Sequence, residues 1–297
     1  MEITVSPAKH NLSTNLNNWE IAYSVDGTGE PVLSIHGGFG GAAQAVSERG
    51  PRPIAEALTN FSLIDYDRRN CGNSEMREEN YSQDDIADEA VALLDHLEIE
   101  TAIICGDSMG GTIAQSLALR HPHRVKALAL IETSAHMRDV SLYGPFHHYS
   151  ELWKSDGMEA CYQRRRESIY NPPPFGNVAD NMPDQFKKFM AEMAEQTRKA
   201  IANADESIVR AAAAGEVCNW AAHSSFDTRE NLQDLPLVPT IIIHGDADSV
   251  VPIEHGLELV DAIKHADSTI VSGGDHGILL WPEAKEALRN WVEKVST

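Results

Sequence analysis

The sequence predicts an α/β fold: a mostly parallel sheet flanked by helices, with an inserted helical cap. Short apolar runs bounded by turn residues alternate with longer amphipathic stretches, as in the βα units of a parallel sheet. This alternation stops between about residues 134 and 226, where no convincing buried strand is found. Long interruptions of this kind are usually functional. We therefore expect a core from residues 1–133 and 227–297 and a lid from residues 134–226.

Seven apolar runs are the expected strands. They lie at residues 19–25, 31–37, 61–67, 101–107, 125–132, 239–246 and 268–274. Amphipathic stretches between them are the expected covering helices, as at residues 83–97, where apolar residues recur at helical spacing. The interval assigned to the lid holds a proline run at 172–174 and helix-like stretches at 184–203 and 206–214.

Composition excludes several classes of function. The formal net charge of −21 argues against a nucleic acid or an anionic membrane as partner, because phosphates would be repelled. Four scattered cysteines without CxxC spacing favour neither a zinc site nor a disulfide framework. The N-terminus lacks a signal-peptide pattern, and no run reaches the roughly 18 apolar residues of a membrane span. A cytoplasmic protein is the expectation.

A serine flanked by glycines is the most informative motif. In "CGDSMGG", Ser108 stands two residues from both Gly106 and Gly110, after an apolar run and before a helix-like stretch. A sharp turn from strand to helix strains the backbone, and glycines leave room for it. The following helix N-terminus favours developing negative charge. The context indicates a nucleophile; the alternative is that Ser108 only caps a helix after a glycine turn.

A serine hydroxyl needs a base and an acid that orients the base. "HGDADSVVP" and "GGDHG" follow two later strands, so their side chains should reach the sheet edge of Ser108. We assign Asp248 as the acid and His276 as the base. Asp246 and Asp275 are the alternative acids, the first more typical of a turn cap and the second adjacent to the base. A histidine base predicts a kcat/KM that rises through a pKa of roughly 6 to 7.

An oxyanion hole is expected from the glycine-rich segment "HGGFGG", residues 36–41, which follows a strand. Its Gly38 N–H can point to the same place as the N–H of Met109, and Phe39 is the second candidate. Glycine-rich loops also bind phosphate, but this one lacks GxGxxG spacing and a Walker lysine.

The segments "HGG", "DYDRRNCGNS", "GDSMGG", "HGDADSVVP" and "GGDHG" together resemble the α/β-hydrolase family, in its capped esterase and lactonase branch, over residues 19–291. The resemblance implies an eight-stranded, mostly parallel sheet with a helical cap after the sixth strand. Two features differ from the commonest family pattern. Asp107 precedes the serine where histidine or glutamine is frequent, and the loop at residues 40–53 is longer and lacks the usual proline.

The function expected from these residues is serine hydrolysis of a small carboxylic ester or lactone through an acyl-enzyme. No cofactor and no metal are implied, since the adjacent histidines of "FHHYS" lack metal-ligand spacing. The oligomeric state is left open, a homodimer included.

The substrate pocket and the rival functions are less determined by sequence. Phe39 and the cap aromatics, Phe146 and Trp153 among them, suggest an apolar pocket, although aromatics at helical spacing are more often core. A carbon–carbon bond hydrolase is disfavoured because no tryptophan directly follows His276. A proline-type aminopeptidase is disfavoured because the cap shows no evident acidic amine-binding motif. A ligand receptor that retains the three residues is a further alternative outside enzymes.

Overall fold

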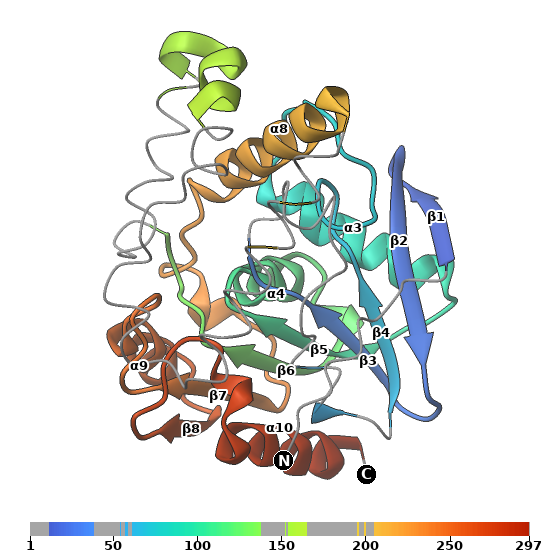
Figure 1. Ribbon diagram of the computed structural model, residues 1–297. Coiled ribbons are helices and arrows are strands. Elements are labelled where there is room, and N and C mark those ends of the chain that lie inside the picture. The colour runs from blue at the N-terminus through green and yellow to red at the C-terminus, as the bar shows by residue number, and fades with distance from the viewer. Residues whose placement is uncertain are drawn as a thin grey trace.

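The computed structural model describes residues 12–38, 61–137, 154–164 and 205–296, with a few single positions between these ranges. Within them, eight strands form one sheet in the order β1-β2-β4-β3-β5-β6-β7-β8 (Figure 1). β2 is antiparallel to both of its neighbours, and all other pairs are parallel. The strands are β1 (Leu12–Leu16), β2 (Trp19–Asp26), β3 (Pro31–Ile35), β4 (Ser62–Tyr66), β5 (Ala102–Asp107), β6 (Val125–Ile131), β7 (Thr240–Gly245) and β8 (Asp267–Val271). The α/β fold with a mostly parallel eight-stranded sheet is confirmed.

The central strands are buried along nearly their whole length. Every residue of β7 is buried, and β5 and β6 each have a single partly exposed position. Strands covered on both faces read as continuous apolar runs, which is why the sequence identifies them. β1 was not among the expected strands, because its sequence LSTNL buries only Leu16 and it lies at the edge of the sheet.

Helices cover both faces of the sheet. Residues of α3 (Gln83–His96), α4 (Met109–Arg120) and α9 (Ile253–Ala262) join one apolar cluster, and residues of α10 (Pro282–Ser296) join the other. α3 begins at a capping box and buries the apolar face that its spacing predicts. No helix in the described part of the chain is long and apolar enough to span a membrane.

Only part of the expected cap is described. Residues 154–164 are helical, and α8 (Glu206–His223) continues well beyond the stretch 206–214 that the sequence indicates. In Figure 1, α8 lies at the opposite end of the view from α10. The proline run and the stretch 184–203, apart from single positions, lie outside the described residues, so the limits of the cap stay a prediction.

Candidate active site

Ser108 lies in a sharp turn between β5 and α4. Its backbone has φ 52° and ψ −118°, a left-handed conformation that costs energy for a residue with a Cβ. The Ser108 N–H donates to the Ile131 carbonyl at 2.8 Å, which ties the turn to the neighbouring strand. The Ser108 side chain makes no capping hydrogen bond to α4. The alternative role as a helix cap therefore has no support in this geometry.

The two glycines around Ser108 are required by close backbone approach. A Cβ on Gly110 would lie 2.0 Å from the Ile35 carbonyl oxygen, and one on Gly106 would lie 2.4 Å from the Gly110 carbonyl oxygen. Real Cβ atoms do not approach backbone this closely. The motif thus permits α4 to pack tightly under the turn that presents Ser108.

His276 and Asp248 meet Ser108 at the carboxyl-terminal edge of the sheet. The His276 Nε2 atom lies 3.1 Å from Ser108 Oγ, and His276 Nδ1 lies 3.0 and 3.2 Å from the two carboxylate oxygens of Asp248. Asp248 follows β7 and His276 follows β8. The structure thus brings together three residues separated by up to 168 positions, in hydrogen-bonding order.

Only one of the three candidate acids contacts the imidazole. Asp248 also accepts the Val250 and Val251 N–H groups through Oδ1, both at 2.8 Å. Burial opposes ionisation of Asp248, but His276 outweighs it, so the pKa of Asp248 lies below its usual value. Asp246 instead accepts the Gly273 N–H. Asp275 accepts from Ser249 and from the backbone N–H of His276.

A second pair of carboxyl groups, Asp107 and Glu132, lies beside His276. The sequence marks Asp107 as unusual in its position before the serine but does not indicate Glu132. Glu132 follows β6 with Oε2 3.8 Å from His276 Nδ1, and it accepts the Ile278 N–H. Asp107 shares a side-chain hydrogen bond with Glu132. Two carboxyl groups joined in this way hold at least one proton between them. Burial raises the pKa of both groups, that of Glu132 well above its usual value.

These carboxyl groups change the expected titration of the base. Burial alone would lower the pKa of His276, but Glu132, Asp248 and Asp107 together raise it to about 10. The ordinary histidine pKa expected from sequence is thereby corrected upward. The charge of Glu132 contributes most to raising the pKa of His276, so protonation of Glu132 lowers that pKa.

A pH–rate profile tests this coupling. A base must be neutral to accept a proton, so a raised pKa of His276 places the acid limb of kcat/KM above the usual histidine range. Glu132→Gln removes the carboxyl group that, when ionised, raises the pKa of His276, and is expected to move that limb toward lower pH by up to about 3 pH units. Glu283→Gln, an exposed change on α10, is the matched control and should leave the profile in place. Superimposable profiles for Glu132→Gln and the native protein would contradict the coupling.

The loop after β3 approaches Ser108 from the other side. A Cβ on Gly37 would lie 2.9 Å from both Ser108 Cβ and the Asp107 carbonyl oxygen, so only glycine lets the loop come this close. Gly38 follows with φ 72°, and Met109 begins α4. Both expected oxyanion residues therefore flank Ser108 in the chain segments that contact it. Phe39 lies outside the described residues.

Arg68 is a further charged group at this loop that the sequence did not single out. Its guanidinium Nη2 donates to the Gly38 carbonyl at 2.5 Å, and Nη1 lies 3.9 Å from the sulfur of Met109. The side chain is fully buried. Arg68 thus contacts both residues assigned to the oxyanion hole.

Described parts of the expected cap pack against the serine turn. Met109 belongs to an apolar cluster with Met158 of the 154–164 helix and with Val217 and Trp220 of α8. In addition, the Asn219 side chain of α8 donates to backbone carbonyls of residues 69 and 70. Phe146 and Trp153, the expected pocket residues, lie outside the described part of the chain.

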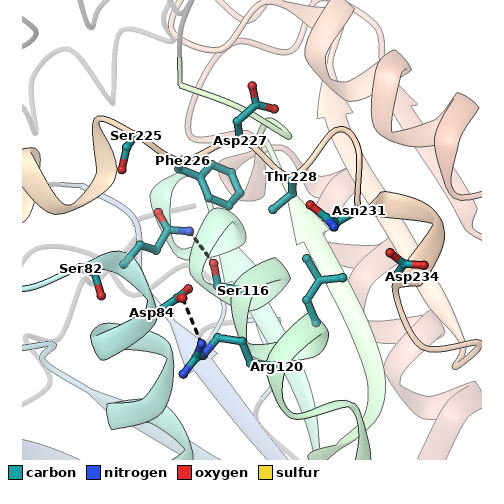
Figure 2. Close-up of a pocket in the computed structure, with 12 residues that line it drawn as sticks. Ser82, Asp84, Ser116, Arg120, Ser225, Phe226, Asp227, Thr228, Asn231 and Asp234 are labelled. Carbon is teal, nitrogen blue, oxygen red and sulfur yellow. Dashed lines mark hydrogen bonds and ion pairs between the residues drawn. The ribbon is translucent and has the colours of Figure 1, made fainter.

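A separate cavity lies away from these residues. It has a volume of about 470 Å³ and is lined by residues of α3, α4 and the segment 225–234 (Figure 2). Its polar wall includes the ion pair of Arg120 with Asp84, and Gln83 there bonds Ser116. None of Ser108, Asp248 and His276 lines it. The cavity is therefore not the site of the chemistry considered below.

Two groups among the described residues bring three metal-ligating atoms within 4.8 Å of one another. One is Glu132, Asp248 and His276, whose polar atoms already bond one another or neighbouring backbone groups. The other combines His136 with residues 255 and 258 of α9. The "FHHYS" histidines lie outside the described residues. The reaction considered below uses neither group as a metal site.

Comparison with known proteins agrees with this fold and motif order. A family model described as the alpha/beta hydrolase fold matches residues 30–283. The chain is 25% identical over 231 residues to 3-oxoadipate enol-lactonase 2 of Acinetobacter baylyi, covering 78% of both chains. It is 27% identical over 267 residues to 2-hydroxymuconate semialdehyde hydrolase of a Pseudomonas species, covering 89% of this chain and 84% of the relative. The crystal structure of an enol-lactonase from Burkholderia xenovorans superposes with a TM-score of 0.67 at 22% identity, covering 96% of this chain and 99% of that one.

Proposed function

The chain belongs to the α/β-hydrolase family, and from that premise we propose that it is a serine hydrolase that cleaves small carboxylic esters or lactones. The observation that carries the proposal is the chain of contacts from Ser108 Oγ through His276 to Asp248. A hydroxyl in contact with a neutral imidazole can lose its proton as it attacks a carbonyl, which makes an ordinary serine reactive.

The proposed reaction has two halves. In the first, Ser108 Oγ bonds to the carbonyl carbon while its proton passes to His276 Nε2, and Asp248 stabilises the imidazolium through Nδ1–H. The C–O bond to the alcohol then breaks, and His276 returns the proton to the alkoxide oxygen. For a lactone, this alcohol stays attached to the acyl group. In the second half, water gives a proton to His276 and attacks the acyl carbon. The bond from this carbon to Ser108 Oγ then breaks as His276 returns the proton to Oγ, which releases the acid and restores Ser108.

The negative charge on the carbonyl oxygen needs donors in both halves. We assign the N–H groups of Gly38 and Met109 to this role, because Met109 directly follows Ser108 and Gly38 directly follows Gly37, whose backbone approaches Ser108 closely. Preorganised donors of this kind are worth roughly 3 to 4 kcal/mol each in the transition state. The N-terminus of α4 adds a favourable dipole at the same place.

Ester or lactone cleavage is preferred over the alternatives on sequence and relatives together. The enol-lactonase relative supports ester or lactone cleavage, whereas the semialdehyde hydrolase relative supports the carbon–carbon alternative. No tryptophan directly follows His276, which disfavours carbon–carbon cleavage. A net charge of −21 supports a small-molecule partner rather than nucleic acid. A receptor with the same contacts would bind its ligand without turnover.

A substrate panel tests the proposal. We expect 4-nitrophenyl esters of short acyl chains and small lactones to be hydrolysed, with kcat/KM at least about tenfold above that for a dienoate carbon–carbon substrate or a prolyl anilide. Ser108→Ala is the matched control for background hydrolysis. Preferential cleavage of the dienoate or of the prolyl anilide would replace the proposal by that activity. Tight binding of an ester without turnover would indicate a receptor.

A further inference from the structure

Arg68 is a buried cation that makes no ion pair with the residues that the structure describes. Its side chain is 0% exposed, and every acceptor that it contacts is neutral: the Gly38 carbonyl, the Met109 sulfur and, at 3.5 Å, the Asn219 amide oxygen. Its Nε–H is buried and makes no hydrogen bond. No ion pair joins Arg68 to an acidic residue in the described part of the chain. Burying a charge in this way costs several kcal/mol unless an anion compensates it.

The adjacent arginine shows the contrast. Arg69 is also buried, but its Nε donates to Glu89 at 2.8 Å, and its backbone N–H donates to the other oxygen of the same carboxylate. Glu89 forms its ion pair with Arg69; the Arg68 charge also acts to lower the pKa of Glu89, but Arg68 makes no ion pair or hydrogen bond with this carboxylate. His223 adds no second positive charge here, because burial and the Arg68 charge hold the pKa of His223 well below its usual value. Among the described residues, Arg69 therefore has a carboxylate in an ion pair and Arg68 does not.

The position of Arg68 relates this charge to the reaction. Gly38 and Met109, both in contact with the guanidinium, are the residues assigned to the oxyanion hole. An anion held by Arg68 would therefore lie beside the carbonyl under attack, on the side of the loop after β3. The planar guanidinium of arginine can donate two parallel hydrogen bonds to one carboxylate, which the compact ammonium group of lysine cannot.

We propose that Arg68 binds a carboxylate of the substrate, so that the preferred esters or lactones carry a free acid group near the scissile bond. This inference rests on the proposed function. The weak contacts at 3.5 and 3.9 Å are the ones that an entering carboxylate displaces, and the flexible thioether of Met109 can move aside. The 2.5 Å bond to Gly38 then stays in place and holds the loop.

Matched esters test the proposal. Mono-4-nitrophenyl glutarate and 4-nitrophenyl valerate have acyl chains of equal length, one ending in a carboxylate and one in a methyl group. At constant ionic strength, the native protein is expected to prefer the glutarate. Arg68→Met should lower kcat/KM for the glutarate by roughly 10- to 100-fold more than for the valerate, because both esters share any loss that follows from the missing bond to Gly38. Arg68→Lys should fall between, and Arg120→Met, a surface arginine paired with aspartates, should match the native protein.

A structural role for Arg68 gives a different result. If Arg68 only supports the loop through Gly38, both esters lose activity in the same proportion, and this outcome overturns the proposal. If the native protein prefers none of the succinate, glutarate and adipate half-esters over neutral esters of equal length, the proposal is also overturned. Thermal unfolding of each variant separates loss of folding from loss of recognition.

Binding without turnover separates this proposal from the proposed function. In Ser108→Ala protein, calorimetry should detect monomethyl glutarate, which carries one carboxylate, more strongly than neutral dimethyl glutarate. Adding Arg68→Met should abolish the difference. Binding that depends on Arg68, with no ester hydrolysis by the native protein, upholds the carboxylate site and contradicts the hydrolase. Ester hydrolysis by the native protein, together with binding that does not depend on Arg68, upholds the hydrolase and contradicts the carboxylate site.

Discussion

Ser108→Ala is expected to lower kcat for a 4-nitrophenyl ester by roughly five to six orders of magnitude. Removal of a serine nucleophile has an effect of this size, because the remaining groups act only through it. Serine already places a Cβ at φ 52°, so alanine adds no new backbone strain and the turn should keep its shape. Steady-state kinetics with freshly purified protein, checked for contaminating esterase, measures the loss.

Ser116→Ala is the matched control for this prediction. Ser116 is a buried serine of α4 whose hydroxyl accepts from Gln83, away from the contacts of His276. We expect its activity to stay within a few-fold of the native value. A Ser108→Ala protein with native activity would mean that another group is the nucleophile.

Asp248→Asn is expected to lower kcat by up to about four orders of magnitude while leaving the fold intact. Oδ1 of Asp248 accepts two backbone N–H groups, so an asparagine should keep its carbonyl oxygen there and turn its amide NH₂ toward His276 Nδ1. Nδ1 must then be an acceptor, and the proton moves to Nε2. An imidazole with its proton on Nε2 cannot accept one from Ser108.

Asp246→Asn distinguishes the orienting acid from its neighbour. The Asp246 side chain accepts the Gly273 N–H of the turn after β8, and asparagine keeps a carbonyl oxygen for that bond. Its kcat should fall less than about tenfold, with a loss of stability no larger than about 1 kcal/mol. The reverse ranking, with Asp246→Asn inactive and Asp248→Asn active, would show that the acid is misassigned.

The parts of this molecule that the sequence reveals are those with local signals. Buried strands are continuous apolar runs, and the turn at Ser108 requires glycines at fixed positions, so both can be recognised along the chain. The order of Ser108, Asp248 and His276 follows because parallel strands end at one edge of a sheet. β1 escapes because an exposed edge strand of polar residues has no such pattern.

The parts that the sequence does not reveal depend on tertiary register. The register of β5 and β6 sets Asp107 opposite Ile131, so the next residue, Glu132, lies close to Asp107. Glu132 also lies 3.8 Å from His276, and nothing local in the sequence marks it as special. Nothing in the sequence distinguishes Arg68 from its neighbour Arg69. Only the folded chain shows that Glu89 accepts a hydrogen bond from Arg69. Buried charges of this kind are decided by distant partners, which a pattern along the chain does not encode.

The most direct test of the account is the mass of the protein during turnover. Native protein mixed with excess 4-nitrophenyl butyrate, quenched in acid within milliseconds and digested, should show a butyryl group on the peptide that contains Ser108. The amount of this peptide should match a burst of nitrophenolate of about one equivalent. Ser108→Ala should show neither. An acyl group on another residue, or rapid turnover with neither burst nor adduct, would contradict the proposal that Ser108 is the nucleophile.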